Sequence, residues 1–89
     1  MRVTIENTRP CADLPDALMI EGQYHGNLEN FLMALENKGC KTISLQGAGI
    51  HIGSGEGFSV QIDEKGNFIF SRLKDEKDMR NWLESMNND

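Results

Sequence analysis

Cysteines and long apolar runs are scarce in this chain. Two cysteines, Cys11 and Cys40, in 89 residues are too few for the disulfide framework that many small secreted domains use. No apolar run approaches the ~20 residues that a membrane-spanning helix needs, and the first seven residues lack the apolar core of a signal peptide. These absences predict a cytoplasmic protein without a membrane segment.

Basic side chains are also in the minority. Nine Lys and Arg stand against fourteen Asp and Glu, which gives a formal net charge of −5, and an acidic chain repels the phosphate backbone of nucleic acids. The densest basic stretch, residues 72–80, is interleaved with acids and is typical of a mixed-charge helix start. We therefore expect no direct contact with nucleic acid.

A chain of 89 residues is small, and we expect a single α+β domain spanning residues 1–89. Two segments have helical periodicity, one between the N-cap residue Asn27 and Gly39, the other after Asp75. Each has apolar residues at i, i+3, i+4 and i+7: Leu28, Phe31, Leu32 and Leu35 in the first, and Met79, Trp82, Leu83 and Met86 in the second.

Between these helices the apolar period changes to two, which predicts strands and hairpins. Residues 63–67 are typical of a hairpin turn with Gly66 in the left-handed conformation, which sets Ile62 opposite Phe68. We expect a second hairpin to turn through residues 53–57, with Ile52 opposite Phe58. A third is expected to turn through residues 46–49, with Ile43 opposite Ile52 and Leu45 opposite Ile50. This register predicts one buried sheet face of Ile43, Leu45, Ile50, Ile52, Phe58, Val60, Ile62, Phe68 and Phe70.

The first quarter of the chain has weaker signals. Val3 and Ile5 alternate as in an edge strand, and residues 17–21 suit a second short strand, while residues 7–16, with two prolines, are typical of a loop. Residues 87–89 suit a frayed tail. The predicted architecture is a two-layer α+β fold with an antiparallel meander sheet of four to six strands and two helices packed on one face.

The residues with metal-ligand or nucleophile chemistry are Cys11, His25, Cys40 and His51. None forms the short Cys-x-x-Cys or His-x-x-x-His pair of a structural zinc site, so we expect no metal and no cofactor. A thiol nucleophile would need one of the histidines within hydrogen-bond distance, and the predicted register gives His51 only serine and glutamine neighbours. We therefore predict no catalytic residue, and a thiol-dependent enzyme using Cys40 or His51 is our third interpretation of function.

A glycine-rich run, residues 47–57, invites comparison with a phosphate-binding loop. Such a loop leads into a helix and brings a lysine, whereas this run alternates apolar residues, contains Glu56 and leads into a strand. Hairpin turns account for the glycines, and an anion-binding nest at residues 53–57 is the alternative.

The opposite sheet face is predicted to be flat and mostly neutral, a surface suited to contact with a partner. The leading interpretation is a small non-enzymatic protein-interaction domain that binds another protein or itself, with a homodimer slightly favoured over a monomer whose outer face is merely solvated. The alternative is an accessory inhibitor carried by a mobile element, acting on a larger enzyme or nucleic-acid machine. The predicted interaction face contains Thr42, Ser44, His51, Ser59, Gln61, Ile69 and Ser71.

Overall fold

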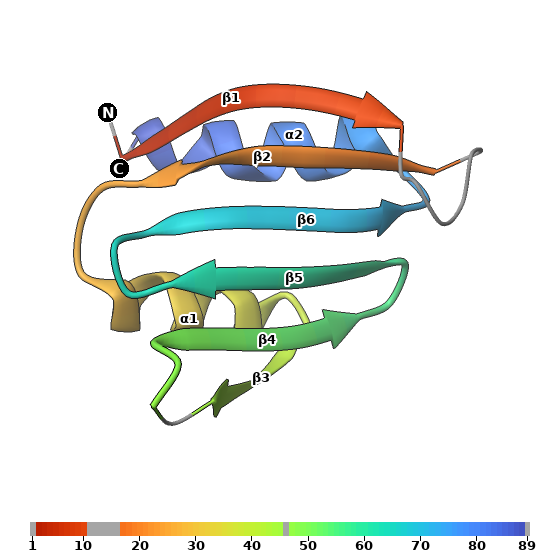
Figure 1. The fold of residues 1–89 in the computed structure, drawn as a ribbon. Coiled ribbons are helices and arrows are strands. Elements are labelled where there is room, and N and C mark those ends of the chain that lie inside the picture. Colours follow the sequence, from red (N-terminus) through yellow and green to blue (C-terminus); the bar gives the residue numbers. More distant parts are fainter. Residues whose placement is uncertain (1, 11–16, 46, 89) are drawn as a thin grey trace.

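A computed structural model describes residues 2–10, 17–45 and 47–88. It contains a single six-stranded sheet in the order β1-β2-β6-β5-β4-β3, with neighbouring strands antiparallel (Figure 1), which confirms the α+β class. The elements are β1 (Val3–Pro10), β2 (Leu18–Tyr24), α1 (Leu28–Asn37), β3 (Lys41–Leu45), β4 (Ile50–Gly55), β5 (Phe58–Asp63), β6 (Asn67–Leu73), α2 (Glu76–Ser85) and the 3-10 turn η1 (Met86–Asn88).

The sheet combines two groups of consecutive strands. Strands β3 to β6 form a meander, while β1 and β2 form a separate hairpin whose second strand pairs with β6. Helix α1 carries the chain from β2, the strand next to the β1 edge, to β3 at the opposite edge of the sheet. The two edge strands of the sheet are therefore β1 and β3.

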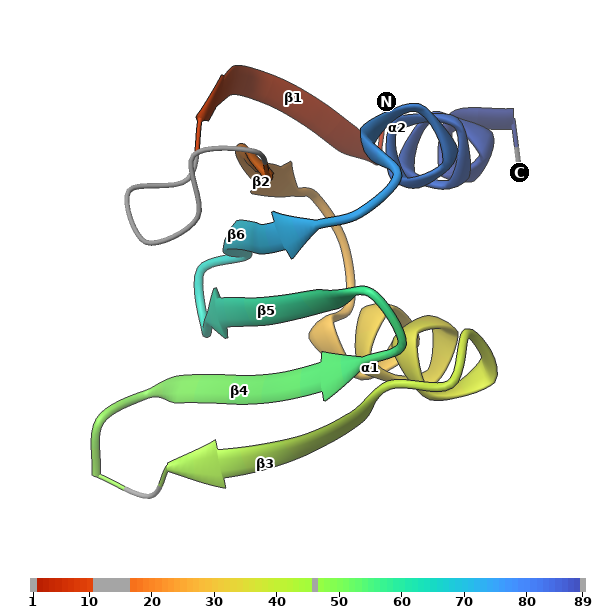
Figure 2. The same ribbon diagram turned by 90° about the vertical axis from the view of Figure 1, so that its right-hand side faces the viewer.

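Both helices lie on the same side of the sheet in Figure 2, α2 beside β2 and α1 beside β3. Their aromatic residues meet over β6, because the ring of Phe70 has its centroid 6.4 Å from that of Phe31 and 6.2 Å from that of Trp82. Lys38 joins the two helices as well, with its Nζ 5.3 Å from the centroid of the Trp82 ring and 3.4 Å from Oδ2 of Asp78. We call the helix-covered side of the sheet the inner face and the other side the outer face.

The helix starts follow the predicted caps. Oδ1 of Asn27 accepts a hydrogen bond of 2.8 Å from the backbone N–H of Glu29, and Oδ1 of Asp75 accepts one of 3.0 Å from that of Asp78. A capping side chain of this kind contributes about 1 kcal/mol to stability, because it satisfies a backbone donor that the helix cannot. Both predicted N-caps are confirmed.

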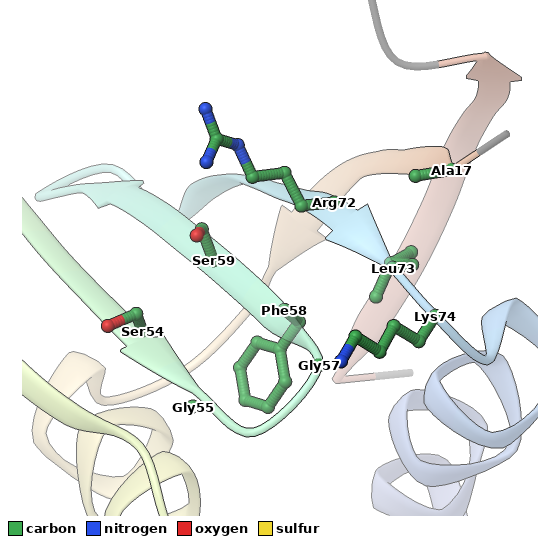
Figure 3. Close-up of a pocket in the computed structure, with 9 residues that line it drawn as sticks. All are labelled: Ala17, Ser54, Gly55, Gly57, Phe58, Ser59, Arg72, Leu73 and Lys74. Carbon is green, nitrogen blue, oxygen red and sulfur yellow. The ribbon is translucent and has the colours of Figure 1, made fainter. Parts of the chain in front are cut away.

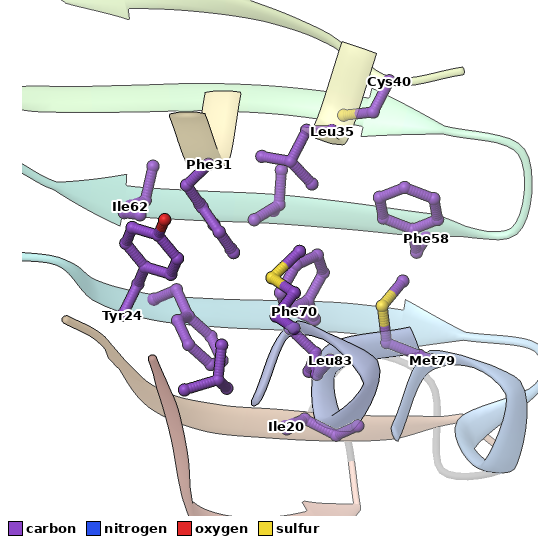
Figure 4. Packing of buried hydrophobic residues seen from close by; sticks show 14 of the residues in the cluster. Ile20, Tyr24, Phe31, Leu35, Cys40, Phe58, Ile62, Phe70, Met79 and Leu83 are labelled. Carbon is purple, nitrogen blue, oxygen red and sulfur yellow. The ribbon is translucent and has the colours of Figure 1, made fainter. Parts of the chain in front are cut away.

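The core lies between the inner face and the two helices (Figure 4). Phe31, Phe68 and Phe70 are almost fully buried, and burying such a side chain contributes about 1.5–3 kcal/mol. The sheet residues whose predicted burial is confirmed are Phe58, Val60, Ile62, Phe68 and Phe70, and the helix residues Phe31, Leu35 and Leu83 are buried with them.

The β5–β6 hairpin has the predicted register. Ile62 is paired with Phe68 and Val60 with Phe70, while Gly66 has a φ of 94°, the left-handed conformation that the turn requires. Oδ1 of Asp63 accepts hydrogen bonds of 2.9 Å from the N–H of Lys65 and 3.0 Å from that of Asn67. The carboxylate thus holds the turn that sets the register of these strands.

The predicted register of the β4–β5 hairpin is wrong. The chain turns through Glu56 and Gly57 alone, so that Gly55 is paired with Phe58 and Ile52 with Gln61. Gly57, with a φ of 81°, supplies the left-handed turn residue. Because successive strand residues point to opposite faces, this pairing turns the whole of β4 over relative to the prediction.

Strand β3 turns over together with β4. The pairs that join these two strands, Ile43 with Ile52 and Leu45 with Ile50, are the predicted ones. All four side chains therefore lie on the outer face rather than in the core. The predicted burial of Ile43, Leu45, Ile50 and Ile52 is wrong for this reason.

Core packing explains why β4 adopts this orientation. A methyl group on Gly55 would lie 2.6 Å from Cε1 of Phe58, and one on Gly53 would lie 2.6 Å from the carbonyl oxygen of Lys41 and 3.1 Å from Sγ of Cys40. Two of the inner positions of β4, Gly53 and Gly55, are glycines because neighbouring atoms already fill the space where a side chain would go. Gly53 and Gly55 are therefore strand residues, not parts of a five-residue turn.

Two expectations for the ends of the chain need correction. Residues 7–10 continue β1 rather than begin a loop, because the pairing with β2 resumes at Asn7 after a register shift; residues 11–16 lie outside the described part of the chain. Asn87 is not frayed, since its Oδ1 accepts hydrogen bonds of 2.9 Å from the N–H groups of both Arg2 and Val3. This side chain ties the last turn to the first strand.

Candidate interaction surface

The outer face, which Figure 1 shows toward the viewer, has a concentration of aliphatic side chains on its β3–β4 side. Ile43 is 66% exposed, Leu45 41% and Ile52 38%, and the half-buried Ile50 lies beside them. We call these four residues the β3–β4 patch. An antiparallel sheet with one solvated face normally places polar residues there, so the patch is an exception that calls for an explanation.

A shallow groove of about 320 Å³ lies next to the patch. One row of residues crosses the strands from the patch into the groove, because Ile43 is paired with Ile52, Ile52 with Gln61, and Gln61 with Ile69. Ile69 itself is half-buried. The groove, called the outer groove below, is lined by Met19, Ile52, Ser59, Val60, Gln61, Ile69 and Ser71.

Four of the seven residues of the predicted interaction face lie on the outer face, namely Ser59, Gln61, Ile69 and Ser71. The other three, Thr42, Ser44 and His51, lie on the inner face, since His51 is paired with Ile62 and Ser44 with His51. Their predicted placement is wrong because the short Glu56–Gly57 turn reverses β4 and, through it, β3. The sequence signal for the true register was Gly57 directly before Phe58, which permits a two-residue turn.

Charged side chains on the outer face nearly balance. The ladder places Arg9, Lys41, Glu21 and Asp63 there, and in Figure 3 the Arg72 side chain also extends away from the helices. Arg9 and Glu21 form an ion pair with each other. Among the charged strand residues whose face these observations assign, three cationic and two anionic side chains lie on the outer face, whereas the whole chain has a net charge of −5.

A second hollow, of about 570 Å³, opens between the β4–β5 turn and the end of β6 (Figure 3). Arg72 in its wall has a φ of 56°, and among the described residues other than glycine it alone has a positive φ. The described lining contains no histidine, cysteine or carboxylate and therefore no acid–base pair. The lining consists of Ala17, Ser54, Gly55, Gly57, Phe58, Ser59, Arg72, Leu73 and Lys74.

The alternative of an anion-binding nest at residues 53–57 does not agree with the structure. Residues 53–55 belong to strand β4, where successive N–H groups point in opposite directions and do not converge on one anion.

The thiol of Cys40 is fully buried, at the start of the chain's path from α1 into β3, and desolvation by burial raises its pKa. A raised pKa keeps the group as a thiol at neutral pH, whereas a nucleophile must be a thiolate.

Nε2 of His25 lies 3.1 Å from Oγ1 of Thr4 at the surface, and His51 is paired with Ile62. Cys11 lies outside the described residues.

No group of three or more His, Cys, Asp or Glu residues in the described ranges could hold a metal ion. Within the same ranges, neither helix has the length and apolar character required to cross a bilayer.

In comparisons with protein-family models, with curated proteins and with solved structures, nothing matches this chain. The outer face therefore has to be interpreted from its own chemistry.

Proposed function

We propose that this chain is a protein-interaction domain and that it binds its partner through the outer face, with the β3–β4 patch at the centre of the contact. The observation that carries the proposal is the position of three exposed aliphatic side chains and the half-buried Ile50 side by side on two adjacent strands. Contiguous exposed apolar patches of this kind mark sites of protein contact more often than scattered surface residues do.

The distribution of polar residues on β3 and β4 supports this proposal. Thr42, Ser44 and His51 point to the helix side, while the isoleucines of the same strands point to the open side. Exposed aliphatic surface is unfavourable in water by about 25 cal/mol per Å², and a partner that covers it recovers that free energy. The patch is thus better suited to a complex than to an isolated monomer.

The proposal is for a non-enzymatic domain that acts in the cytoplasm. The buried Cys40 thiol, with its raised pKa, lacks the thiolate character of a nucleophile, and a chain with only two cysteines suits a reducing compartment.

Site-specific photo-cross-linking tests the proposed surface. Benzoylphenylalanine in place of Ile43 should give a discrete cross-linked protein adduct in cells from which the gene comes, whether the captured protein is another chain or this one. The matched control is the same residue in place of Met33, which is 61% exposed but lies on α1, on the helix side of the sheet. Equal adducts at both positions, or none at position 43, would overturn the proposal.

A further inference from the structure

The proposed interaction surface also indicates what occupies it. Building on that proposed function, we infer that the partner is a second copy of this chain, and that two outer faces stack as a symmetric sandwich with Ile43 of each copy seated in the outer groove of the other.

The shape of the outer face suits this arrangement. Ile43 on β3 has the largest exposed fraction among the exposed large hydrophobic residues, and Ile69 in the outer groove lies on β6, three strands away, a separation of about 14 Å. In a two-fold contact, residue i of one copy meets residue j of the other and the reverse contact follows by symmetry. An axis near the Ile52–Gln61 pair, midway along the row, would place both copies of Ile43 in grooves at once.

The overlap area fits a weak dimer. With the axis near the Ile52–Gln61 pair, β4 of one copy lies over β5 of the other and β3 over β6, so four strands of each sheet overlap. Four strands at ~4.8 Å spacing and about six residues at ~3.3 Å rise cover roughly 20 Å by 20 Å. Two such areas amount to roughly 800 Å², which is typical of a weak, transient interface. A dimer with a dissociation constant of about 0.1–1 mM is the expected result, because the covered area is small and part of it is polar.

Charge also favours this face over others for self-association. Two copies of a chain with a net charge of −5 repel each other at long range. On the overlapping strands β3 to β6, the outer face carries Lys41 and Arg72 against Asp63, so the two copies meet without an acidic excess in the contact.

Edge-to-edge pairing of β3 is the competing way to form a dimer. Strand β3 has only five residues and contains Lys41, and both features are ways in which proteins protect an edge against pairing. Edge pairing would also leave Ile52 and the groove around Ile69 uncovered. Face-to-face stacking covers the patch and the groove together, and for that reason it is the arrangement that we propose.

The test uses the purified full chain, measured by light scattering and sedimentation from about 10 μM to about 1 mM, so that even a dissociation constant near 1 mM would populate dimers. The average mass should rise with concentration from the 10.0 kDa of one chain toward twice that value. Ile43→Lys and Ile69→Lys should each raise the dissociation constant at least about 100-fold, because each buries an ammonium group against aliphatic side chains. Met33→Lys, on α1, is the control and should leave the dimer unchanged. Circular dichroism and thermal melts establish that each variant is folded.

Each remaining outcome overturns the inference. A mass of one chain up to millimolar concentration excludes a self-complex, and if position 43 still cross-links to a different protein in cells, the proposed function stands without it. A dimer that survives Ile69→Lys but not Ile43→Lys would indicate edge pairing through β3. A dimer that survives both variants would place the contact elsewhere, and the outer face would then have no part in self-association.

Discussion

The ring of Phe58 occupies the space where a side chain on Gly55 would lie. The two residues are paired across the β4–β5 hairpin, and a methyl group on Gly55 would approach Cε1 of the ring to 2.6 Å and Cζ to 2.7 Å. The ring has little freedom to retreat, since Phe58 is buried and its centroid lies 5.8 Å from that of Phe70. This contact fixes which residues of β4 face the helices.

Gly55→Ala should therefore lower the free energy of unfolding by about 1–3 kcal/mol, the usual cost of overpacking a core. Ser54→Ala is the control, because Ser54 is the exposed neighbour on the opposite face of the same strand, and its effect should stay within about 0.5 kcal/mol. Urea denaturation measures both. Equal midpoints for the two variants would contradict the described packing of Phe58.

Phe70 is the aromatic residue on which the core converges, with ring contacts to Phe31, Phe58, Phe68 and Trp82. Phe70→Ala should cost about 3–5 kcal/mol, a large share of the 5–15 kcal/mol typical of a domain. Met33→Ala, on the exposed side of α1, should change stability little. Thermal melts that shift equally for both would show that Phe70 is not central to the core.

The Cys40 thiol should react slowly with a thiol reagent at neutral pH while the protein is folded, and rapidly in denaturant. Burial both blocks access to it and raises its pKa, which lowers the thiolate fraction in the folded protein. The variant Cys11→Ser isolates this thiol for the measurement. Native labelling as fast as that of the denatured chain would restore the interpretation of Cys40 as a nucleophile.

Asp63 should make the β5–β6 turn sensitive to acid. Partial desolvation acts to raise the pKa of Asp63, but hydrogen bonds from the side chain and N–H of Asn67 and from the N–H groups of Lys65 and Gly66 outweigh it, so the pKa lies below the usual value of an aspartate. The pKa of Asp63 is therefore lower in the folded protein than in the unfolded chain. The carboxylate stabilises the folded protein fully at a pH above the unfolded pKa, and this stabilisation is lost as the pH falls through the folded pKa.

The comparison of wild type with Asp63→Asn tests this effect. The wild type should lose stability relative to the variant as the pH falls below about 4, the range in which an unfolded Asp takes up a proton. Unfolding free energies measured between neutral pH and about pH 2.5 give the difference. A difference that does not depend on pH would mean that the carboxylate charge does not hold the turn.

Local patterns in the sequence determined most of the elements. The apolar spacing and the caps at Asn27 and Asp75 located both helices, and the turn around Gly66 fixed the pairing of β5 with β6. The Ile43–Ile52 pairing also followed from sequence alone. These features depend on residues close together in the chain, whose conformational preferences can be read without knowledge of distant contacts.

The candidate site could not be predicted in the same way. Residues 50–57 permit both a long turn and a two-residue turn, and the apolar alternation of β4 fits either face of the sheet. Only the tertiary structure decided between them, because the Phe58 ring and the Cys40 thiol leave no room for side chains on the inner side of Gly53 and Gly55. The isoleucines of β3 and β4 were thereby placed on the outer face, where they form the proposed binding surface.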